Sequence, residues 1–484
     1  MATTGGVLVR GSLETILRRA AGAVPPARPL VPVADLRDGK VRLHLPEGFR
    51  YRSFHDTDVL VGDPPITLDD GTSLPGRHDG MAAFPGRSGT VWLVRNHEVN
   101  GPVAAAFGPG DPYDGHAGGG TTTIHVTTDG HVLDAFTSLN GTQMNCSGGA
   151  MPWGSWISCE ETVNGPDVGP DFTNAPNTTL EQRHGFIFEV PAGQQSNRTP
   201  IRAAGRFAHE AAAFSPHEGF VYLTEDNFAF PSGLYRYRPP VHPMQARRLV
   251  DGGRLQMLRV TGRPAAHLEA EQVIGATYPV EWVDIDDADP TFPYTPGEPA
   301  PTANNAAITY VGDQGRAAGA ALFSRLEGAV FTKGEVYFTS TQGGGPPETG
   351  PQLTLGYGRG AGQVWSYDPR RSRLTCRYQS PGTDTLELPD NITSRGGRGT
   401  IVICEDGPVE NYVRGLGHQA GLFDIALNRL TRNNPSPDGT FAPRFAEEFA
   451  GATFSSDGQT LFVNIQASQG VTFAIWGPWG RLGV

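Results

Sequence analysis

Long apolar runs and clusters of positive charge are both missing from this chain of 484 residues. No apolar stretch reaches the roughly 18 residues that a helix needs to span a bilayer. The 38 Lys and Arg residues are outnumbered by 50 Asp and Glu residues, which gives a formal net charge of -12, and the cations form no run. Because proteins that grip nucleic acid gather a basic face, we expect neither a nucleic acid partner nor a membrane partner.

Cysteine is scarce as well, and the motifs of several enzyme classes are absent. The four cysteines show no CxxC spacing and are too few for a disulfide scaffold of this length. The chain contains no P-loop, no GxSxG elbow and no dinucleotide fingerprint after a strand. Nucleotide hydrolysis at a Walker site and serine esterase chemistry are therefore not expected.

Glycine and proline are abundant, with 64 and 41 residues. Together they make up about 22% of the chain, against roughly 12% in an average protein, so turns must be frequent. Helical periodicity is confined to residues 13–21, whereas short β-rich runs bounded by Gly, Asp and Pro recur from about residue 78 onward. This pattern predicts an all-β fold.

Six copies of one sequence pattern recur along the chain. Each copy has a polar residue, small residues, a Gly-containing turn and a β-strand that closes on polar or acidic residues. The opening positions, spaced by 67, 64, 117, 63 and 60 residues, are Asp79, Cys146, Glu210, Glu327, Asp390 and Ala450. Repeated sheets that pack on their neighbours and close into a ring form a β-propeller. We predict a six-bladed β-propeller with a long insertion between the third and fourth repeats, or seven blades if residues 267–287 hide a degenerate unit.

The domain prediction follows from the lack of a proline-rich linker within the ring. We predict a single β-propeller domain over residues 46–484, preceded by an N-terminal arm over residues 1–45. The pair Arg18-Arg19 in that arm is similar to a twin-arginine export signal, but the stretch that follows is short and broken by proline. The arm thus offers no convincing signal peptide.

Repeat-equivalent positions should converge, because the innermost strand of every propeller blade lines the central channel. Besides the opening positions, the strand ends carry acidic residues, namely Glu98, Glu160, Asp226 and Asp406. Like charges at about 4 Å cost about 4 kcal/mol each at an effective dielectric constant near 20, so such a ring needs cations. Calcium prefers carboxylate oxygens, whereas a thiolate points to a softer metal such as iron or zinc. The pattern therefore indicates a mixed metal cluster.

Structural alternatives exist for these residues. Acidic residues at strand ends also form turn hydrogen bonds or face solvent. Cys146 and Cys159 could be buried thiols or a mutual disulfide. Arg325 lies two residues before Glu327, on the same face of a strand, so it could pair with that carboxylate or could hold a substrate phosphate by bidentate hydrogen bonds.

Several motifs, in order from about residue 46 to 467, resemble those of the PhoX-type alkaline phosphatases. They are Pro46-Glu47-Gly48-Phe49-Arg50-Tyr51-Arg52, His78-Asp79-Gly80-Met81-Ala82-Ala83-Phe84, Leu93-Val94-Arg95-Asn96-His97-Glu98, Asn145-Cys146-Ser147-Gly148-Gly149, Pro152-Trp153-Gly154-Ser155-Trp156 leading to Cys159-Glu160-Glu161, and Phe462-Val463-Asn464-Ile465-Gln466. The resemblance implies a six-bladed propeller whose channel holds ferric iron and calcium with one cysteine thiolate among the ligands. It also implies hydrolysis of small phosphomonoesters and a periplasmic or secreted location.

The resemblance assigns roles to individual residues. Cys146 of the Asn-Cys-x-Gly-Gly motif is the expected thiolate ligand, and the expected carboxylate ligands are Glu98, Glu160, Glu210, Asp226, Glu327 and Asp406. Arg325 is the expected catalytic and substrate-binding residue, which clamps the phosphate during metal-assisted in-line displacement at phosphorus. We expect the protein to be a monomer.

Two departures from the family and two rival functions stay open. The chain has Tyr310-Val311-Gly312-Asp313-Gln314 where the family often has Tyr-x-Gly-Asp-Asp, which puts one calcium site in question, and the usual twin-arginine leader is missing. One rival is a calcium-dependent lactonase or arylesterase propeller, which would not need the thiolate. The other is a non-catalytic binding propeller whose metals only stabilise the fold.

Overall fold

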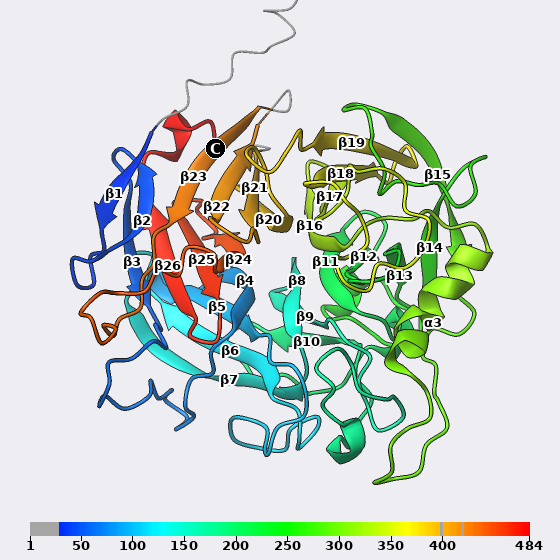
Figure 1. Ribbon diagram of the computed structural model, residues 1–484, viewed down its shortest axis with the longest axis horizontal. Helices are drawn as coiled ribbons and strands as arrows, with labels where there is room; N and C mark the ends of the chain where they lie inside the picture. The colour runs from blue at the N-terminus through cyan, green and yellow to red at the C-terminus, as the bar shows by residue number, and fades with distance from the viewer. Residues whose placement is uncertain (1–28, 397–399, 418–420) are drawn as a thin grey trace, which may run out of the picture.

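The computed structural model describes residues 29–396, 400–417 and 421–484 (Figure 1). Strands dominate these residues, as expected for a mostly β protein, and the α-helices named in the structure are α2 (Pro243–Ala246) and α3 (Asn304–Ala317). No helix in these ranges is both long enough and apolar enough to cross a membrane. The helical stretch expected over residues 13–21 and the pair Arg18-Arg19 lie outside the described residues.

Hydrogen bonding groups the strands into five sheets within the described residues. The first sheet contains β4 (His78–Pro85), β5 (Val91–His97), β6 (Gly119–Val126) and β7 (Val132–Thr142). The second contains β8 (Asn145–Met151), β9 (Ser155–Glu160) and β10 (Ile187–Pro191). All neighbouring strands in these two sheets are antiparallel.

The largest sheet has nine strands and joins two antiparallel groups. The first group is β11 (His209–Ser215), β12 (Phe220–Glu225), β13 (Leu234–Arg238), β14 (Arg254–Val260) and β15 (Thr277–Asp284). The second is β16 (Leu326–Thr332), β17 (Glu335–Ser340), β18 (Gln363–Asp368) and β19 (Arg373–Gln379). Strand β15 pairs with β14 on one side and with β19 on the other, so it bridges the two groups at the rim of the molecule.

The last two sheets combine strands from both ends of the chain. One contains β20 (Pro389–Ser394), β21 (Ile401–Glu405), β22 (Tyr412–Leu416) and β23 (Leu422–Asn428), extended by β2 (Val41–Pro46) and β1 (Leu30–Ala34). The other contains β24 (Glu448–Phe454), β25 (Thr460–Gln466) and β26 (Val471–Trp476), and β3 (Arg50–Phe54) completes it. Strand β3 therefore fastens the start of the described chain to its end.

One strand of each group faces the centre of the molecule, and these six inner strands form a ring (Figure 1). Around the ring, β4 contacts β8, β8 contacts β11, β11 contacts β16, β16 contacts β20, β20 contacts β24, and β24 returns to β4. The apolar core lies between adjacent sheets, where side chains such as Leu43, Val402, Phe449 and Phe473 are fully buried. Each such side chain contributes about 1.5–3 kcal/mol to stability.

Small residues in the inner strands allow the strands to approach one another closely. A Cβ atom added to Gly149 would lie 1.7 Å from the carbonyl oxygen of Ala212 on the next inner strand. At Gly451, where φ is +61°, it would lie 2.4 Å from the carbonyl oxygen of Asp79. The small residues of the sequence repeat are thus required by packing at the centre of the ring.

The same irregularity interrupts all six inner strands. The pairing register with the second strand of the group shifts after His78, Asn145, His209, Leu326, Pro389 and Ala450. A β-bulge of this kind leaves a residue out of the ladder and redirects its side chain. The residues that follow these six positions therefore share one orientation relative to the axis of the ring.

Candidate metal and phosphate site

A polar cavity of about 130 Å³ lies where the inner strands converge, and we call it the acidic cavity. Its lining is almost entirely ionisable and consists of Asp79, Glu98, Cys146, Glu161, Glu210, Asp226, Arg325, Glu327, Asp390, Asp406, Glu448 and Gln466. These residues come from every group of strands in the ring, most of them from bulges of the inner strands or from the ends of the second strands. The site thus depends on the whole ring.

The β-bulges supply one half of the acidic cavity. Five of the six bulged positions line it, and these are Asp79, Cys146, Glu210, Glu327 and Asp390. In the sixth copy the bulged residue is Gly451, one position after the Ala450 used in the sequence comparison, and it has no side chain. Glu448 and Gln466 line the cavity on that side instead.

The ends of the second strands supply the other half. The backbone amides of Glu98, Glu161, Asp226 and Asp406 each donate a hydrogen bond to a carbonyl oxygen just before the partner inner strand, over 2.9–3.2 Å. All four side chains line the acidic cavity. This shared backbone geometry defines the equivalent positions more sharply than the sequence pattern does.

Glu160, predicted as a metal ligand, has its carboxylate outside the acidic cavity. It accepts hydrogen bonds from the backbone amides of Gln143 and Gly185, both at 2.9 Å, and lies 2.6 Å from Nδ1 of the buried His184. Adjacent residues of an extended strand point to opposite sides, so Glu161 faces the cavity while Glu160 faces the interior of its sheet. Glu161 takes the place predicted for Glu160.

The same division applies to two further acidic pairs. Glu225 accepts hydrogen bonds from the amide of Gly233 and the hydroxyl of Tyr235, both at 2.9 Å, while the next residue, Asp226, lines the cavity. Glu405 pairs with Arg414 at 3.0 Å, while Asp406 lines the cavity. In each pair the first carboxylate holds the sheet together and the second faces the axis of the ring.

Every other residue predicted for the site lies in the acidic cavity, namely Glu98, Cys146, Glu210, Asp226, Arg325, Glu327 and Asp406. The sequence reasoning left out Asp79, Glu161, Asp390, Glu448 and Gln466. Asp79 and Asp390 occupy opening positions of the repeat and could have been included on that ground. Gln466 ends one of the motifs that resemble the family, whereas Glu448 carries no signal in the sequence; both line the cavity on the side where Gly451 has no side chain.

Two groups of possible metal ligands share one residue. Ligand atoms of Cys146, Glu161 and Glu210 lie within 4.8 Å of one another, as do those of Glu210, Glu327 and Asp390. In addition, Oδ1 of Asp79 is buried without a hydrogen-bond partner among the described residues. Carboxylates fit hard cations such as Ca²⁺, and the thiol of Cys146 fits a softer metal, so this set of donors suits a mixed cluster.

The electrostatics of the cavity also favour cations. Burial, together with the nearby carboxylates, raises the pKa of Glu98 to about 7 and that of Asp390 to about 8. Burial also raises the pKa of Glu210 and of Glu327 well above the ordinary range, with neighbouring carboxylates adding to the effect. So many carboxylates cannot all be ionised at neutral pH unless positive charge lies between them.

Arg325 is the one cation among the residues that line the acidic cavity. Its Nε and Nη2 donate to the two carboxylate oxygens of Asp226 at 3.2 and 2.7 Å, and Nη2 lies 3.2 Å from Oε1 of Glu327. Its Nη1 has no hydrogen-bond acceptor among the described residues. The guanidinium lies 5.4 Å from the centre of the Phe228 ring. Both alternatives weighed for this residue thus keep support, because it pairs with carboxylates and retains a free donor.

Cys159 and the segment 310–314 lie away from the acidic cavity. All four cysteines are free, so Cys146 and Cys159 form no disulfide, and Cys159 is fully buried in the apolar core. Asp313 and Gln314 belong to α3, where Asp313 pairs with Arg316 at 2.9 Å and Gln314 donates to the carbonyl oxygen of Asp287. The departure from the family motif therefore does not alter the lining of this cavity.

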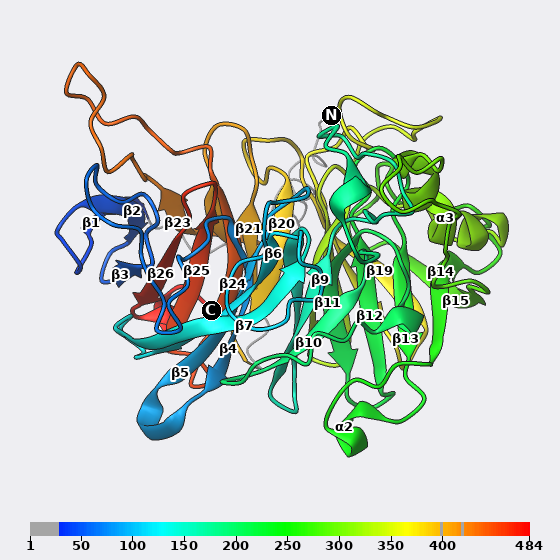
Figure 2. The ribbon, with the colours of Figure 1, turned by 90° about the horizontal axis from the view of Figure 1, so that it is seen from below.

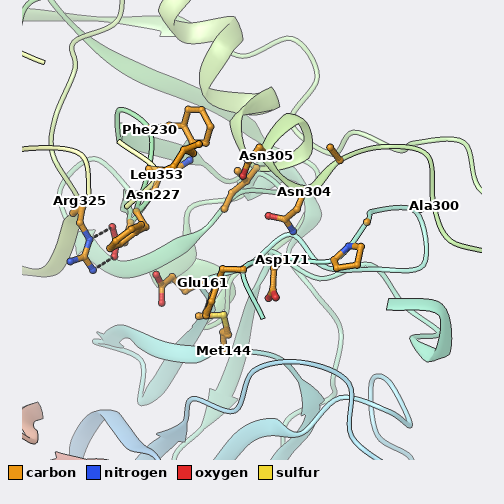
Figure 3. Close-up of a pocket in the computed structure, with 18 of the residues that line it drawn as sticks. Met144, Glu161, Asp171, Asn227, Phe230, Ala300, Asn304, Asn305, Arg325 and Leu353 are labelled. Atoms are coloured by element: carbon orange, nitrogen blue, oxygen red, sulfur yellow. Dashed lines mark hydrogen bonds and ion pairs between the residues drawn. The ribbon is translucent and has the colours of Figure 1, made fainter. Parts of the chain in front are cut away.

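A second, larger cavity of about 990 Å³ adjoins the acidic cavity, and we call it the outer cavity (Figure 3). The two share Glu98, Glu161, Asp226 and Arg325. A molecule entering through the outer cavity would meet Arg325 and the carboxylates at its inner end. This arrangement can hold an anionic group at Arg325 and the rest of a ligand in the outer cavity.

Comparison with solved structures supports the fold. No curated protein matches the chain. The structure of PhoX from Pseudomonas fluorescens in complex with vanadate matches at 15% identity with a TM-score of 0.57, covering 94% of this chain and 98% of that one. A gluconolactonase from Xanthomonas campestris (13% identity, 94% and 99% covered) and the PQQ domain of a pyranose dehydrogenase from Coprinopsis cinerea (12%, 92% and 100%) reach TM-scores of only 0.36 and 0.30.

The family match extends over most of the described chain. Residues 29–135 and 119–469 match the family described as alkaline phosphatase PhoX. The matched region contains every residue that lines the acidic cavity. The protein therefore belongs to the PhoX alkaline phosphatase family, a family of phosphomonoesterases.

Proposed function

We propose that this protein hydrolyses small phosphomonoesters with a cluster of ferric iron and calcium bound in the acidic cavity. The proposed ligands are Glu98, Cys146, Glu161, Glu210, Asp226, Glu327, Asp390 and Asp406. The observation that carries the proposal is the pair of ligand groups that share Glu210, of which one includes a thiol. When bound, the cations supply Lewis acidity that polarises the phosphoryl oxygens and offsets developing negative charge.

In this proposal Arg325 positions the phosphoryl group. Asp226 holds two nitrogens of the guanidinium and so fixes its plane, while Nη1 is left to donate to a phosphoryl oxygen. A guanidinium held in this way is already oriented before the substrate binds, which makes its hydrogen bonds more effective in the transition state. The carboxylates that surround the phosphoryl group would repel it unless cations were bound, so metal binding must precede substrate binding.

The two rival functions explain less of the site. A calcium-dependent lactonase would use the carboxylates but gives no role to Cys146, whose thiol lies among the ligand atoms. A binding scaffold stabilised by metals gives no role to the free donor of Arg325 or to the outer cavity that leads to it. We therefore favour the phosphatase.

The fold proposal accompanies the functional one. We propose that the ring has six blades, each built around one of the inner strands β4, β8, β11, β16, β20 and β24. The long insertion between the third and fourth repeats then includes α2, β15 and α3. We also propose that residues 46–484 form one domain, that residues 1–45 are an N-terminal arm with β1 and β2 at its end, and that the protein is a monomer.

Elemental analysis of the purified protein, combined with an activity assay, tests the proposal. We expect iron and calcium to be present together, hydrolysis of a chromogenic phosphomonoester, and loss of this activity on chelation. Vanadate, the ligand named for the Pseudomonas PhoX structure, should inhibit. Calcium without a transition metal, together with lactone hydrolysis, would contradict the proposal, as would a protein with both metals and no phosphatase activity.

A further inference from the structure

Much of the wall of the outer cavity is apolar although it is accessible to solvent, and Asp171, Asn227, Asn304 and Asn305 supply its polar part (Figure 3). Phe172 keeps 79% of its surface exposed and Leu353 keeps 65%, and both line the cavity with Phe228, Phe230 and Ile308. Large apolar side chains gathered around a concave surface mark a ligand site more often than a structural one. The floor of the same cavity is formed by Arg325 and the carboxylates described above.

Hydrogen bonds hold the wall in place from several parts of the chain. The amides of Gln352 and Tyr357 donate to the carbonyl oxygens of Ala229 and Phe228, at 2.8 and 2.7 Å. On the opposite side, the amide of Gly169 donates to the carbonyl oxygen of Thr302 at 2.8 Å. The cavity is therefore formed before any ligand binds, and an apolar group can enter without ordering these segments first.

The position of Phe228 links the two ends of the cavity. Its ring lies beside the guanidinium of Arg325, 5.4 Å from centroid to carbon, and it continues the wall toward Phe230. A phosphate held at Arg325 would thus place its ester group directly against an aromatic surface. A polyol group at this position would place hydroxyls against the Phe228 ring, whereas an alkyl or aryl group would remove apolar surface from water there.

We propose that the outer cavity binds the leaving group and selects phosphomonoesters whose leaving group is apolar, alkyl or aryl, over those of sugars and polyols. This inference rests on the proposed function, because it takes Arg325 as the phosphate-binding residue. The phosphate would be held by Arg325 and the proposed cations at the floor, and the apolar group would contact the apolar part of the wall. A phosphomonoester consists of only these two parts, the phosphate and the leaving group.

Unbranched alkyl phosphates test this inference, because ethyl, butyl and hexyl alcohols are leaving groups of nearly equal acidity. We expect kcat/KM to rise with chain length, by up to three- to fourfold for each methylene that becomes fully buried, and to be at least tenfold higher for hexyl than for ethyl phosphate. Glycerol 3-phosphate should react no better than ethyl phosphate. Equal kcat/KM values for ethyl and hexyl phosphate would overturn the inference.

Two leucines on the same loop provide a matched pair of variants. Leu353 lines the outer cavity, whereas Leu355, 71% exposed, does not. Leu353→Ser should lower the hexyl-to-ethyl ratio about threefold or more, and Leu355→Ser should leave it unchanged. A ratio that is unaffected by Leu353→Ser, or affected equally by both variants, would contradict the assignment of this wall.

Binding of alkylphosphonates, which are not hydrolysed, separates this inference from the proposed function. Calorimetry with the metal-loaded protein should show hexylphosphonate binding at least tenfold more tightly than ethylphosphonate, and Leu353→Ser should reduce that preference. If this preference is found but no ester is hydrolysed, the proposed function fails and the apolar subsite stands. If the two phosphonates bind equally, the inference fails. A dimer that Leu353→Ser dissociates would also overturn it, because the wall would then be an interface between two copies.

Discussion

Arg325 and Asp226 form a two-point ion pair between neighbouring repeats, in which Nε and Nη2 donate to the two carboxylate oxygens at 3.2 and 2.7 Å. Only 2% of the Asp226 side chain and 17% of the Arg325 side chain are exposed. The pair is therefore largely removed from water, and its geometry is set by two strands rather than by one flexible side chain. What remains of the guanidinium faces the cavities.

Replacement of this arginine by lysine should abolish most of the activity and leave the metals bound. Arg325→Lys keeps the positive charge but loses the planar fork, so it cannot hold Asp226 and a phosphoryl oxygen at once. We expect kcat to fall by roughly 10²-fold or more, with unchanged iron and calcium. Activity and metal content are measured on the same sample.

Arg316→Lys serves as the control, because Arg316 also pairs with an aspartate, Asp313 on α3, but does not line either cavity. It should keep near-normal turnover. Near-normal turnover in Arg325→Lys, or metal loss in proportion to its activity loss, would mean that Arg325 is a structural partner of the carboxylates and that the phosphate is held elsewhere.

The adjacent residues Glu160 and Glu161 should respond to substitution in opposite ways. Glu161→Gln should lose bound metal. The stability of the metal-free protein should change little, because the Glu161 side chain faces the acidic cavity and not the packed interior of the sheet. Glu160→Gln should retain metal but lower the free energy of unfolding by about 3 kcal/mol, since it removes the nearer of the two carboxylates that pair with the buried His184 and leaves only Asp114.

Metal analysis and denaturant unfolding of both variants decide between them. Metal loss from Glu160→Gln that matches the loss from Glu161→Gln, measured under conditions where both variants are folded, would return Glu160 to the ligand set. Retention of all metal in Glu161→Gln would remove Glu161 from it.

Cys146 and Cys159 give a second matched pair. Cys146→Ser should lose iron, because a serine hydroxyl is a poor substitute for a thiolate ligand. Cys159→Ser should keep iron and lose about 1–3 kcal/mol of stability, because it places a hydroxyl in the apolar core. Iron determination on both variants is the measurement, and iron lost only from Cys159→Ser would reverse the assignment.

After chelation has removed the metals, the stability of the protein should fall as the pH rises, because of the buried carboxylates. Glu98 and Asp390 have pKa values of about 7 and about 8, against 4.5 and 3.8 for the unperturbed groups. Between about pH 4 and 8 the folded state therefore binds more protons than the unfolded state, so its stability falls as the pH rises through this window. Bound cations should remove this fall, because they take the place of the protons.

Calorimetric melting at several pH values, with and without chelator, checks this expectation. His184, held by Glu160 and Asp114, has its pKa raised to about 9, so it should add a further loss of stability toward pH 9 in both forms. If the melting temperature of the metal-free protein stayed constant or rose between pH 5 and 8, the raised pKa values of Glu98 and Asp390 would be contradicted.

The repeat made much of the site predictable from the sequence. Residues such as Glu210 and Glu327 recur at one place in each copy, and a ring brings such places together. The sequence could not distinguish Glu160 from Glu161, because this choice depends on which residue ends the ladder, and hydrogen-bond register is not visible in an acidic pair.

The sixth copy shows a second limit. Gly451 occupies its bulge, and packing against Asp79 forbids any side chain there. Glu448 and Gln466, one on each of two paired strands, lie opposite each other and line the cavity on that side. Nothing in the spacing of the repeat marks these two residues, because they act in place of a missing side chain and belong to no repeated position.

The pairing of β3 with β26 sets the order in which this protein can mature. The ribosome synthesises β3 long before its partner β26, so the joint between them forms only after all the residues between these two strands have emerged. The acidic cavity is complete only when β24 lies between β20 and β4, which is the same late event. A chain that ends before β24 would lack Glu448 and Gln466, and its β3 would have no β26 to pair with. Metal binding by nascent or truncated chains would therefore show whether the ring of inner strands is complete.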